Sequence, residues 1–91
     1  MAEKKSSQPR DIRAIIILLA TQSLIGLGEI NDPLIGGKRV NLGSAALFAD
    51  LLTELQNKTK GNLTADEEKF LDDVAGNLKF LLKKRMGDRH G

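Results

Sequence analysis

The sequence predicts an all-α, three-helix domain in which a first helix and a long loop precede an antiparallel helical hairpin. Three observations lead to this fold class. An apolar run follows Arg13, apolar residues recur at helical spacing further along, and the segment Lys58 to Glu68 ends one helix and begins another. With 91 residues and no cysteine, the chain makes one modest core without disulfides. We therefore expect oligomerisation to complete the fold.

The first helix contains the apolar run Ala14 to Ala20. At about 100° per residue, its large side chains project all round the helix, and one hairpin covers only part of that circumference. The sequence thus predicts a homo-oligomer, with a dimer favoured; the alternative is a first helix sandwiched within its own monomer. The polar residues Thr21, Gln22 and Ser23 are expected to make interhelical hydrogen bonds. The candidate oligomer interface comprises Ile15, Ile16, Ile17, Leu18 and Leu24.

The loop from Gly28 to Val40 is rich in turn formers. We expect either an Ω-like loop or a short two-stranded ribbon, and interpret it as a strap across the hairpin, although loops this long are often functional. The segment Gly36 to Arg39 suggests phosphate binding, but it lacks the spacing of a phosphate-binding loop and a preceding strand. The aliphatic side chains expected to point inward are Ile30, Leu34, Ile35 and Val40.

The second helix is expected to begin after Asn41, a suitable N-cap, and to end near Asn57 or Lys58. Its packing face combines two leucines with two alanines at spacings of three and four residues. Small side chains on this face allow the backbone of another helix to approach closely. The face consists of Leu42, Ala45, Ala49 and Leu52.

The third helix is bounded by clear local signals. Gly61 is suited to the left-handed conformation that closes the preceding helix, and Thr64 with Glu67 forms a predicted capping box. Gly76 lies inside this helix at a cost of up to about 1 kcal/mol, so either a neighbour packs close to it or the helix is locally weak. The apolar stripe is expected to follow Leu71, Val74, Leu78 and Leu81, with Phe70 and Leu82 widening it.

The stretch Asp50 to Glu68 resembles the signature of the bacterial domain-of-unknown-function family numbered 1844. Leu19 to Glu29, then Asp32-Pro33 and Val40 to Leu42, are similar to that family's opening helix and connecting loop. The similarity runs from about residue 12 to about residue 83. The chain departs from the family pattern at Thr53, where an acidic residue is usual, and near Gly76, where an aromatic one is. The resemblance implies a bacterial, cytosolic helical domain of unassigned activity and supplies no catalytic residues.

The sequence offers no catalytic, cofactor or metal site, and we expect a non-enzymatic protein that needs no cofactor. The only histidine, His90, is next to the last residue, where a general acid or base would not be held against a substrate. The pairs Glu67-Glu68 and Asp72-Asp73 point in different directions on a helix, so they do not converge on a metal. Residues 1–9 are assigned to a flexible basic arm, 10–86 to a single helical domain and 87–91 to a flexible tail.

Two functions remain. The first is an oligomeric protein–protein interaction or scaffold module, with an unknown protein as a further partner. The second is weak, sequence-independent nucleic-acid binding through the basic termini, although a formal charge of +2 is small for that role. The apolar run is too short for a membrane span and a clear cleavage site is missing, so a cytoplasmic location is expected. The candidate phosphate contacts are Lys83, Lys84 and Arg85, which also complement the helix dipole.

Overall fold

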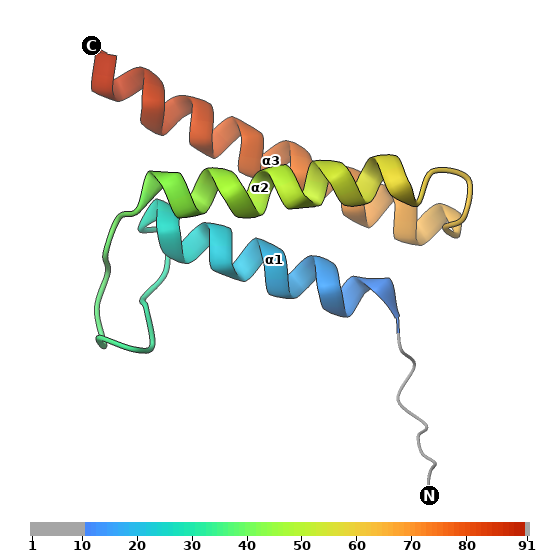
Figure 1. Cartoon of the computed structure of the whole chain (residues 1–91), viewed down its shortest axis with the longest axis horizontal. Helices are drawn as coiled ribbons and strands as arrows, with labels where there is room; N and C mark the ends of the chain where they lie inside the picture. Colours follow the sequence, from blue (N-terminus) through green and yellow to red (C-terminus); the bar gives the residue numbers. More distant parts are fainter. Residues whose placement is uncertain (1–10, 91) are drawn as a thin grey trace, which may run out of the picture.

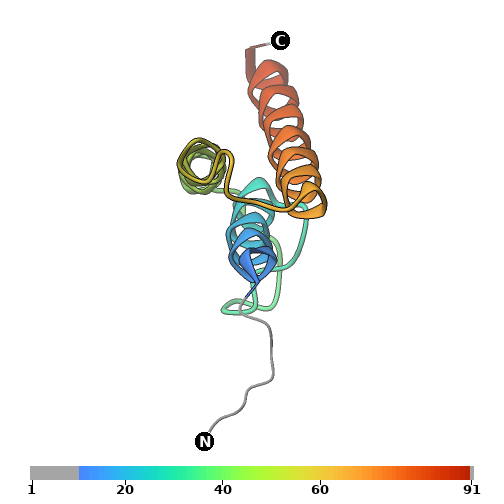
Figure 2. The same cartoon turned by 90° about the vertical axis from the view of Figure 1, so that its right-hand side faces the viewer.

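Each of the three helices packs against the other two. A computed structural model describes the backbone of residues 11–90 and the side chains of residues 11–87. The helices are α1 (Ile12–Leu27), α2 (Leu42–Lys58) and α3 (Ala65–His90), and α2 and α3 run in opposite directions (Figure 1). Seen end-on, the three helices form a triangle with α1 between and below the other two (Figure 2). The predicted all-α, three-helix fold with its helical hairpin is confirmed.

The end of α3 lies beyond the expected boundary of the helical domain. We expected the domain to end at Met86, but helical backbone continues to His90. Gly87 is tolerated in a helix interior at a modest cost, and no proline follows to interrupt the hydrogen bonding. The expected basic arm, residues 1–9, lies outside the described residues.

The ends of α1 are closed by local hydrogen bonds. The Asp11 carboxylate accepts the Arg13 amide at 2.8 Å, which makes Asp11 the N-cap. At the other end Gly28 is left-handed, with φ of +79°. Its amide donates to the Ile25 carbonyl and the Glu29 amide to the Leu24 carbonyl, each at 3.0 Å. These two bonds make a Schellman motif, which turns the chain out of the helix into the loop.

The N-terminal capping signals of α2 and α3 have the predicted geometry. Asn41 accepts the Ser44 amide at 3.0 Å and begins α2. The Thr64 amide donates to the Glu67 carboxylate at 2.9 Å, and the Glu67 amide donates to the Thr64 hydroxyl at 3.1 Å. Gly61 is left-handed as expected, with φ of +82°, but it does not cap α2: Thr59 is the C-cap, and Gly61 lies in the turn that follows, where the Asn62 amide donates to the Thr59 carbonyl.

The core lies along the centre of the triangle. Each helix contributes residues at spacings of three and four, as expected for amphipathic packing. The packing face predicted for α2 is correct in Ala45, Ala49 and Leu52, with Leu42 at its edge. On α3 the predicted Leu71, Leu78 and Leu82 are buried, but the stripe is shifted, because Ala75 is also buried while Val74 and Leu81 pack at the border. The buried apolar residues are Ile16, Leu27, Ala45, Ala49, Leu52, Leu71, Ala75, Leu78 and Leu82.

The closest approach of α1 and α2 occurs at Gly26. A Cβ atom at this position would lie 2.8 Å from the Asn41 carbonyl oxygen and 2.9 Å from the Ala45 nitrogen. Two hydrogen bonds join the helices here, from the buried Ser23 hydroxyl to the Ala45 carbonyl (2.9 Å) and from the Asn41 amide to the Gly26 carbonyl (2.7 Å). The small residues predicted in α2 therefore do permit a close helix contact, and Ser23 makes the expected interhelical hydrogen bond.

The loop is organised by Asp32, which is buried. The Asp32 amide donates to the Gly37 carbonyl at 2.7 Å in an isolated antiparallel bridge, and its carboxylate accepts the Leu34 amide at 2.9 Å. Arg39 lies 3.4 Å from the other carboxylate oxygen. The prediction that the aliphatic side chains tuck inward is wrong: the tight turn directs Ile30, Leu34, Ile35 and Val40 to solvent.

Candidate functional site

The side of α1 that faces away from α2 and α3 is an apolar surface that the packing of the three helices leaves exposed. Ala14, Leu18, Thr21 and Ile25 recur at spacings of three and four on this side, with Ile15 and Ile17 flanking them. Ile15, Ile17 and Leu18 are 50%, 53% and 59% exposed. These six residues are called the α1 outer face. It contains no charged side chain, although the outward face of a helix on the surface of a globular protein normally carries charged or polar residues.

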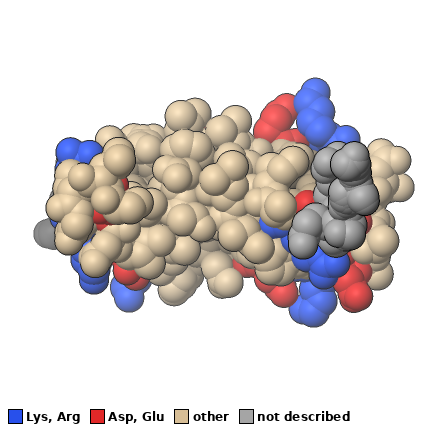
Figure 3. All heavy atoms as spheres, turned by 90° about the horizontal axis from the view of Figure 1, so that it is seen from below, with Lys and Arg blue, Asp and Glu red and all other residues tan. Residues whose placement is uncertain are grey.

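The surrounding surface is also uncharged. Viewed from the side of α1, uncharged residues cover the middle of the molecule and charged side chains gather toward the two ends (Figure 3). Leu47 and Leu51 on α2 are further exposed leucines. At the loop end Leu34 is 88% exposed and Ile35 50%. Exposed apolar residues in such numbers are typical of surfaces that bind other proteins.

The predicted interface residues do not all reach this surface. Ile16 is fully buried between the helices, so the prediction that it forms an oligomer interface is wrong. Leu24 is half-buried and packs at the edge of the core, where it lines a shallow apolar groove between α1 and α3. Ile16 points to the core because the α1 residues at spacings of seven and eleven, Ser23 and Leu27, point the same way. Ile15, Ile17 and Leu18 remain as an accessible set.

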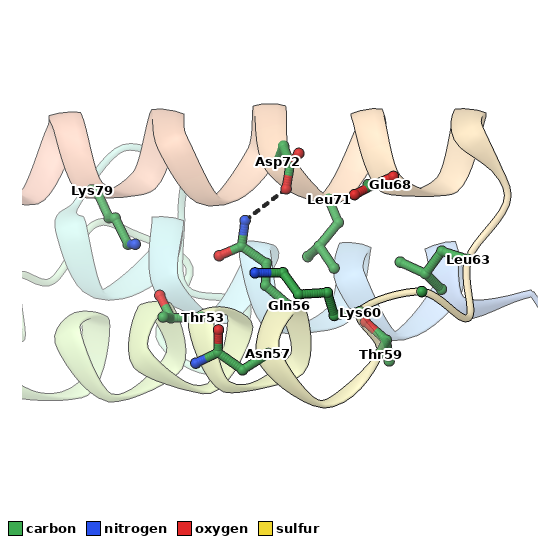
Figure 4. A pocket seen from close by; sticks show the side chains of 11 residues that line it. Thr53, Gln56, Asn57, Thr59, Lys60, Leu63, Glu68, Leu71, Asp72 and Lys79 are labelled. Carbon is green, nitrogen blue, oxygen red and sulfur yellow. Dashed lines mark hydrogen bonds between the residues drawn. The ribbon is translucent and has the colours of Figure 1, made fainter.

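A polar hollow lined by ionisable groups lies between α2 and α3. Lys60, Glu68, Asp72 and Lys79 line it, and the Gln56 amide donates to the Asp72 carboxylate at 2.8 Å across it (Figure 4). Its two hydroxyls are both directed back to their own helix. Thr53 donates to the Ala49 carbonyl at 3.3 Å and Thr59 to the Leu55 carbonyl at 2.6 Å.

The chemistry available in this hollow is limited. A hydroxyl nucleophile needs an adjacent base to accept its proton, and neither Thr53 nor Thr59 donates to one. Among the side chains of residues 11–87, moreover, no three acidic or histidine groups lie close enough together to bind a metal ion. The hollow therefore carries hydrogen-bonding groups without an arrangement for catalysis.

The electrostatic features are confined to the ends of the helices. The hydrogen bonds from the Arg13 side chain and amide hold the pKa of the Asp11 carboxyl below its ordinary value of 3.8. The same pair raises the pKa of the Arg13 guanidinium. At the far end of α3, Lys83 and Lys84 are exposed and Arg85 is half-buried. These candidate phosphate contacts lie at the same end of the molecule as the loop (Figure 1).

Sequence reasoning missed three structurally important residues. Gly26 has a signal that could have been used, since a glycine within an apolar helix often marks close helix packing. Gly28 follows the last apolar residue of α1, which is the usual place for a C-terminal glycine cap. Asp32 precedes Pro33, a common turn-initiating pair. Its role in the loop depends on the Gly37 and Arg39 contacts that only the structure reveals.

Within the part of the chain that the structure covers, no helix has both the length and the hydrophobicity needed to cross a bilayer. No curated protein and no solved structure matches the sequence. The family model of the Domain of unknown function (DUF1844) matches residues 9–83, which include all of α1 and α2 and most of α3. The chain therefore belongs to this family.

Proposed function

We propose that the protein is a small, non-catalytic interaction module that forms a homo-oligomer, most simply a dimer, through the α1 outer face. The observation that carries this proposal is the half-exposed state of Ile15, Ile17 and Leu18 in an uncharged surface. Three adjacent large aliphatic side chains on one helix would be removed from water if a second chain covered them. A cytoplasmic, bacterial setting is part of the same proposal and follows from the resemblance to the family.

The energetics favour a modest affinity. Burying a large aliphatic side chain completely stabilises by about 1.5–3 kcal/mol, and about half of that remains available at each of these three positions. Over two chains the gain is about 5–9 kcal/mol. Association costs an estimated 4–15 kcal/mol, so α1 alone supports at most a weak dimer. Further contacts from Leu47, Leu51 or the loop would be needed for a stable one.

The test is the solution mass measured by light scattering over a hundredfold dilution. We expect the unmodified chain to dimerise in a concentration-dependent manner and an Ile17→Asp, Leu18→Lys variant to be monomeric. The matched control is Phe80→Asp, Met86→Lys, which exchanges two exposed apolar residues of α3 for the same pair of charges. Circular dichroism establishes that both variants fold. A monomer at every concentration, or a dimer that the α1 variant leaves intact, would overturn the proposal.

A second candidate is weak nucleic-acid binding. It is supported by the exposure of Lys83 and Lys84 at the same end as Lys38 and Arg39, where several phosphates could be contacted without reading bases. Fluorescence anisotropy with unrelated duplexes at low salt tests it. Binding that falls with rising salt and is weakened by Lys83→Glu, Lys84→Glu would support this function. No binding at low salt would exclude it.

A further inference from the structure

We infer that the second copy docks on the α1 outer face in the antiparallel orientation, so that the loop end of each chain meets the hairpin-turn end of the other. This inference rests on the proposed dimer and specifies its geometry. A closed two-fold dimer through one helix has two arrangements, since the axis lies either across the helix or along it. An axis across α1 makes the two α1 helices antiparallel, whereas an axis along α1 makes them parallel.

The α1 outer face is compatible with the antiparallel arrangement. Ala14, Leu18, Thr21 and Ile25 form a stripe about 16 Å long. Its centre lies between Leu18 and Thr21. A two-fold axis through that centre pairs Ala14 of each chain with Ile25 of the other and brings the two Leu18 side chains near each other. Leu18, the most exposed large apolar residue of α1, would then be covered in both chains near the middle of the contact.

The charges of the described residues select between the two arrangements. The loop end, residues 28–41 and 83–87, has five basic and two acidic residues, a net charge of +3. The opposite end, residues 11–13 and 54–73, has seven acidic and four basic residues, a net charge of −3. An antiparallel pair places these opposite charges side by side at both ends of the contact. A parallel pair places like charges together, which is unfavourable at low ionic strength.

The shape of the molecule favours the same arrangement. The loop projects beyond α1 at one end only, on the side of the α1 outer face (Figures 1 and 2). In an antiparallel pair, each loop would pass beside the end of the partner's α1 that has no loop. Leu34 and Ile35, both exposed, would then add apolar contact to that of α1. Two loops would meet each other in a parallel pair and separate the helices at that end.

Cysteine crosslinking distinguishes the arrangements, because the native chain contains no cysteine. Chains carrying Ala14→Cys are mixed with chains carrying Ile25→Cys and treated with a short bismaleimide, and the products are identified by mass spectrometry. We expect mainly the mixed product, in which position 14 of one chain is joined to position 25 of the other. In a parallel pair those two positions are about 16 Å apart, and crosslinks between identical variants would predominate instead. A Lys69→Cys variant, altered on the exposed side of α3, serves as the control that should not crosslink.

Each outcome has a definite meaning. Predominant crosslinks between identical variants would overturn the antiparallel arrangement while leaving the dimer in place. A dimer by light scattering that gives no crosslink at either position would overturn docking through α1. A chain that is monomeric by light scattering overturns the proposed function itself, which separates the two failures. Independently, we expect the dimer dissociation constant to rise severalfold from low to high salt. A dissociation constant that falls as the salt concentration rises would indicate that like charges meet in the dimer.

Discussion

Replacing Gly26 by alanine should destabilise the protein, although the same substitution normally stabilises a helix. Gly26 lies within α1 and has no positive φ, so its backbone is acceptable to any residue. What it lacks is space, because a Cβ would lie 2.8–3.0 Å from the Asn41 carbonyl oxygen, the Ala45 nitrogen and the Ala45 Cβ. Two of these atoms belong to the backbone of the α2 N-terminus, so relief requires α1 and α2 to move apart.

The magnitude follows from three contributions. Overpacking of this kind costs about 1–3 kcal/mol. Separating the helices also weakens the buried hydrogen bond from Ser23 to the Ala45 carbonyl, which contributes about 0.5–1.5 kcal/mol. Against these, alanine has a helix propensity about 1 kcal/mol better than glycine. The net loss is about 2 kcal/mol, which corresponds to a fall in Tm of about 8–16 °C for a domain of this size.

The assay is urea unfolding followed by circular dichroism, with Gly76→Ala as the matched control. Gly76 also lies inside a helix, but apart from its chain neighbours and the backbone of its own helix, no atom lies within 4 Å of a Cβ built there. We therefore expect Gly76→Ala to stabilise by about 0.5–1 kcal/mol. All samples are compared at one protein concentration, because association would raise apparent stability. Equal stabilisation by the two substitutions would refute the close contact between α1 and α2.

Three further substitutions test local interactions that stabilise the fold. Thr64→Ala should lower the free energy of unfolding by about 1 kcal/mol by removing the capping box, as measured by urea unfolding; an unchanged midpoint would argue against the cap. Asp32→Ala should loosen the loop and speed its cleavage in limited proteolysis, whereas Glu29→Ala, an exposed neighbour, should not. Asp11 has a folded pKa below 3.8, so its stabilising effect is complete above about pH 5 and is lost as the pH falls through the folded pKa. Asp11→Asn, followed by thermal melts from pH 2 to 6, should reduce that acid-induced loss, and an unaltered pH profile would contradict this assignment.

The ends of the helices could be predicted because their causes are local. Asn41, Thr64 and Glu67 satisfy backbone groups no more than three residues away, so the residues in sequence are sufficient to specify the geometry. The spacing of apolar residues by three and four in α2 likewise predicted its buried face, because Ala45 and Leu52 lie on one side of a helix whatever packs there. The all-α class, the helical hairpin and the family resemblance could likewise be recognised from the sequence alone.

Tertiary structure decided which apolar residues are covered. In α1, Ile15, Ile16 and Ile17 are chemically identical, and only the positions of α2 and α3 determine that Ile16 is buried while its two neighbours stay half-exposed. The outward direction of Leu34 depends on the Asp32 to Gly37 bridge, and the role of Gly26 on the approach of Ala45. The sequence by itself determined the helices, because their signals act over a few residues. Only the structure decided the exposed face of α1, because burial depends on contacts between segments distant in the chain.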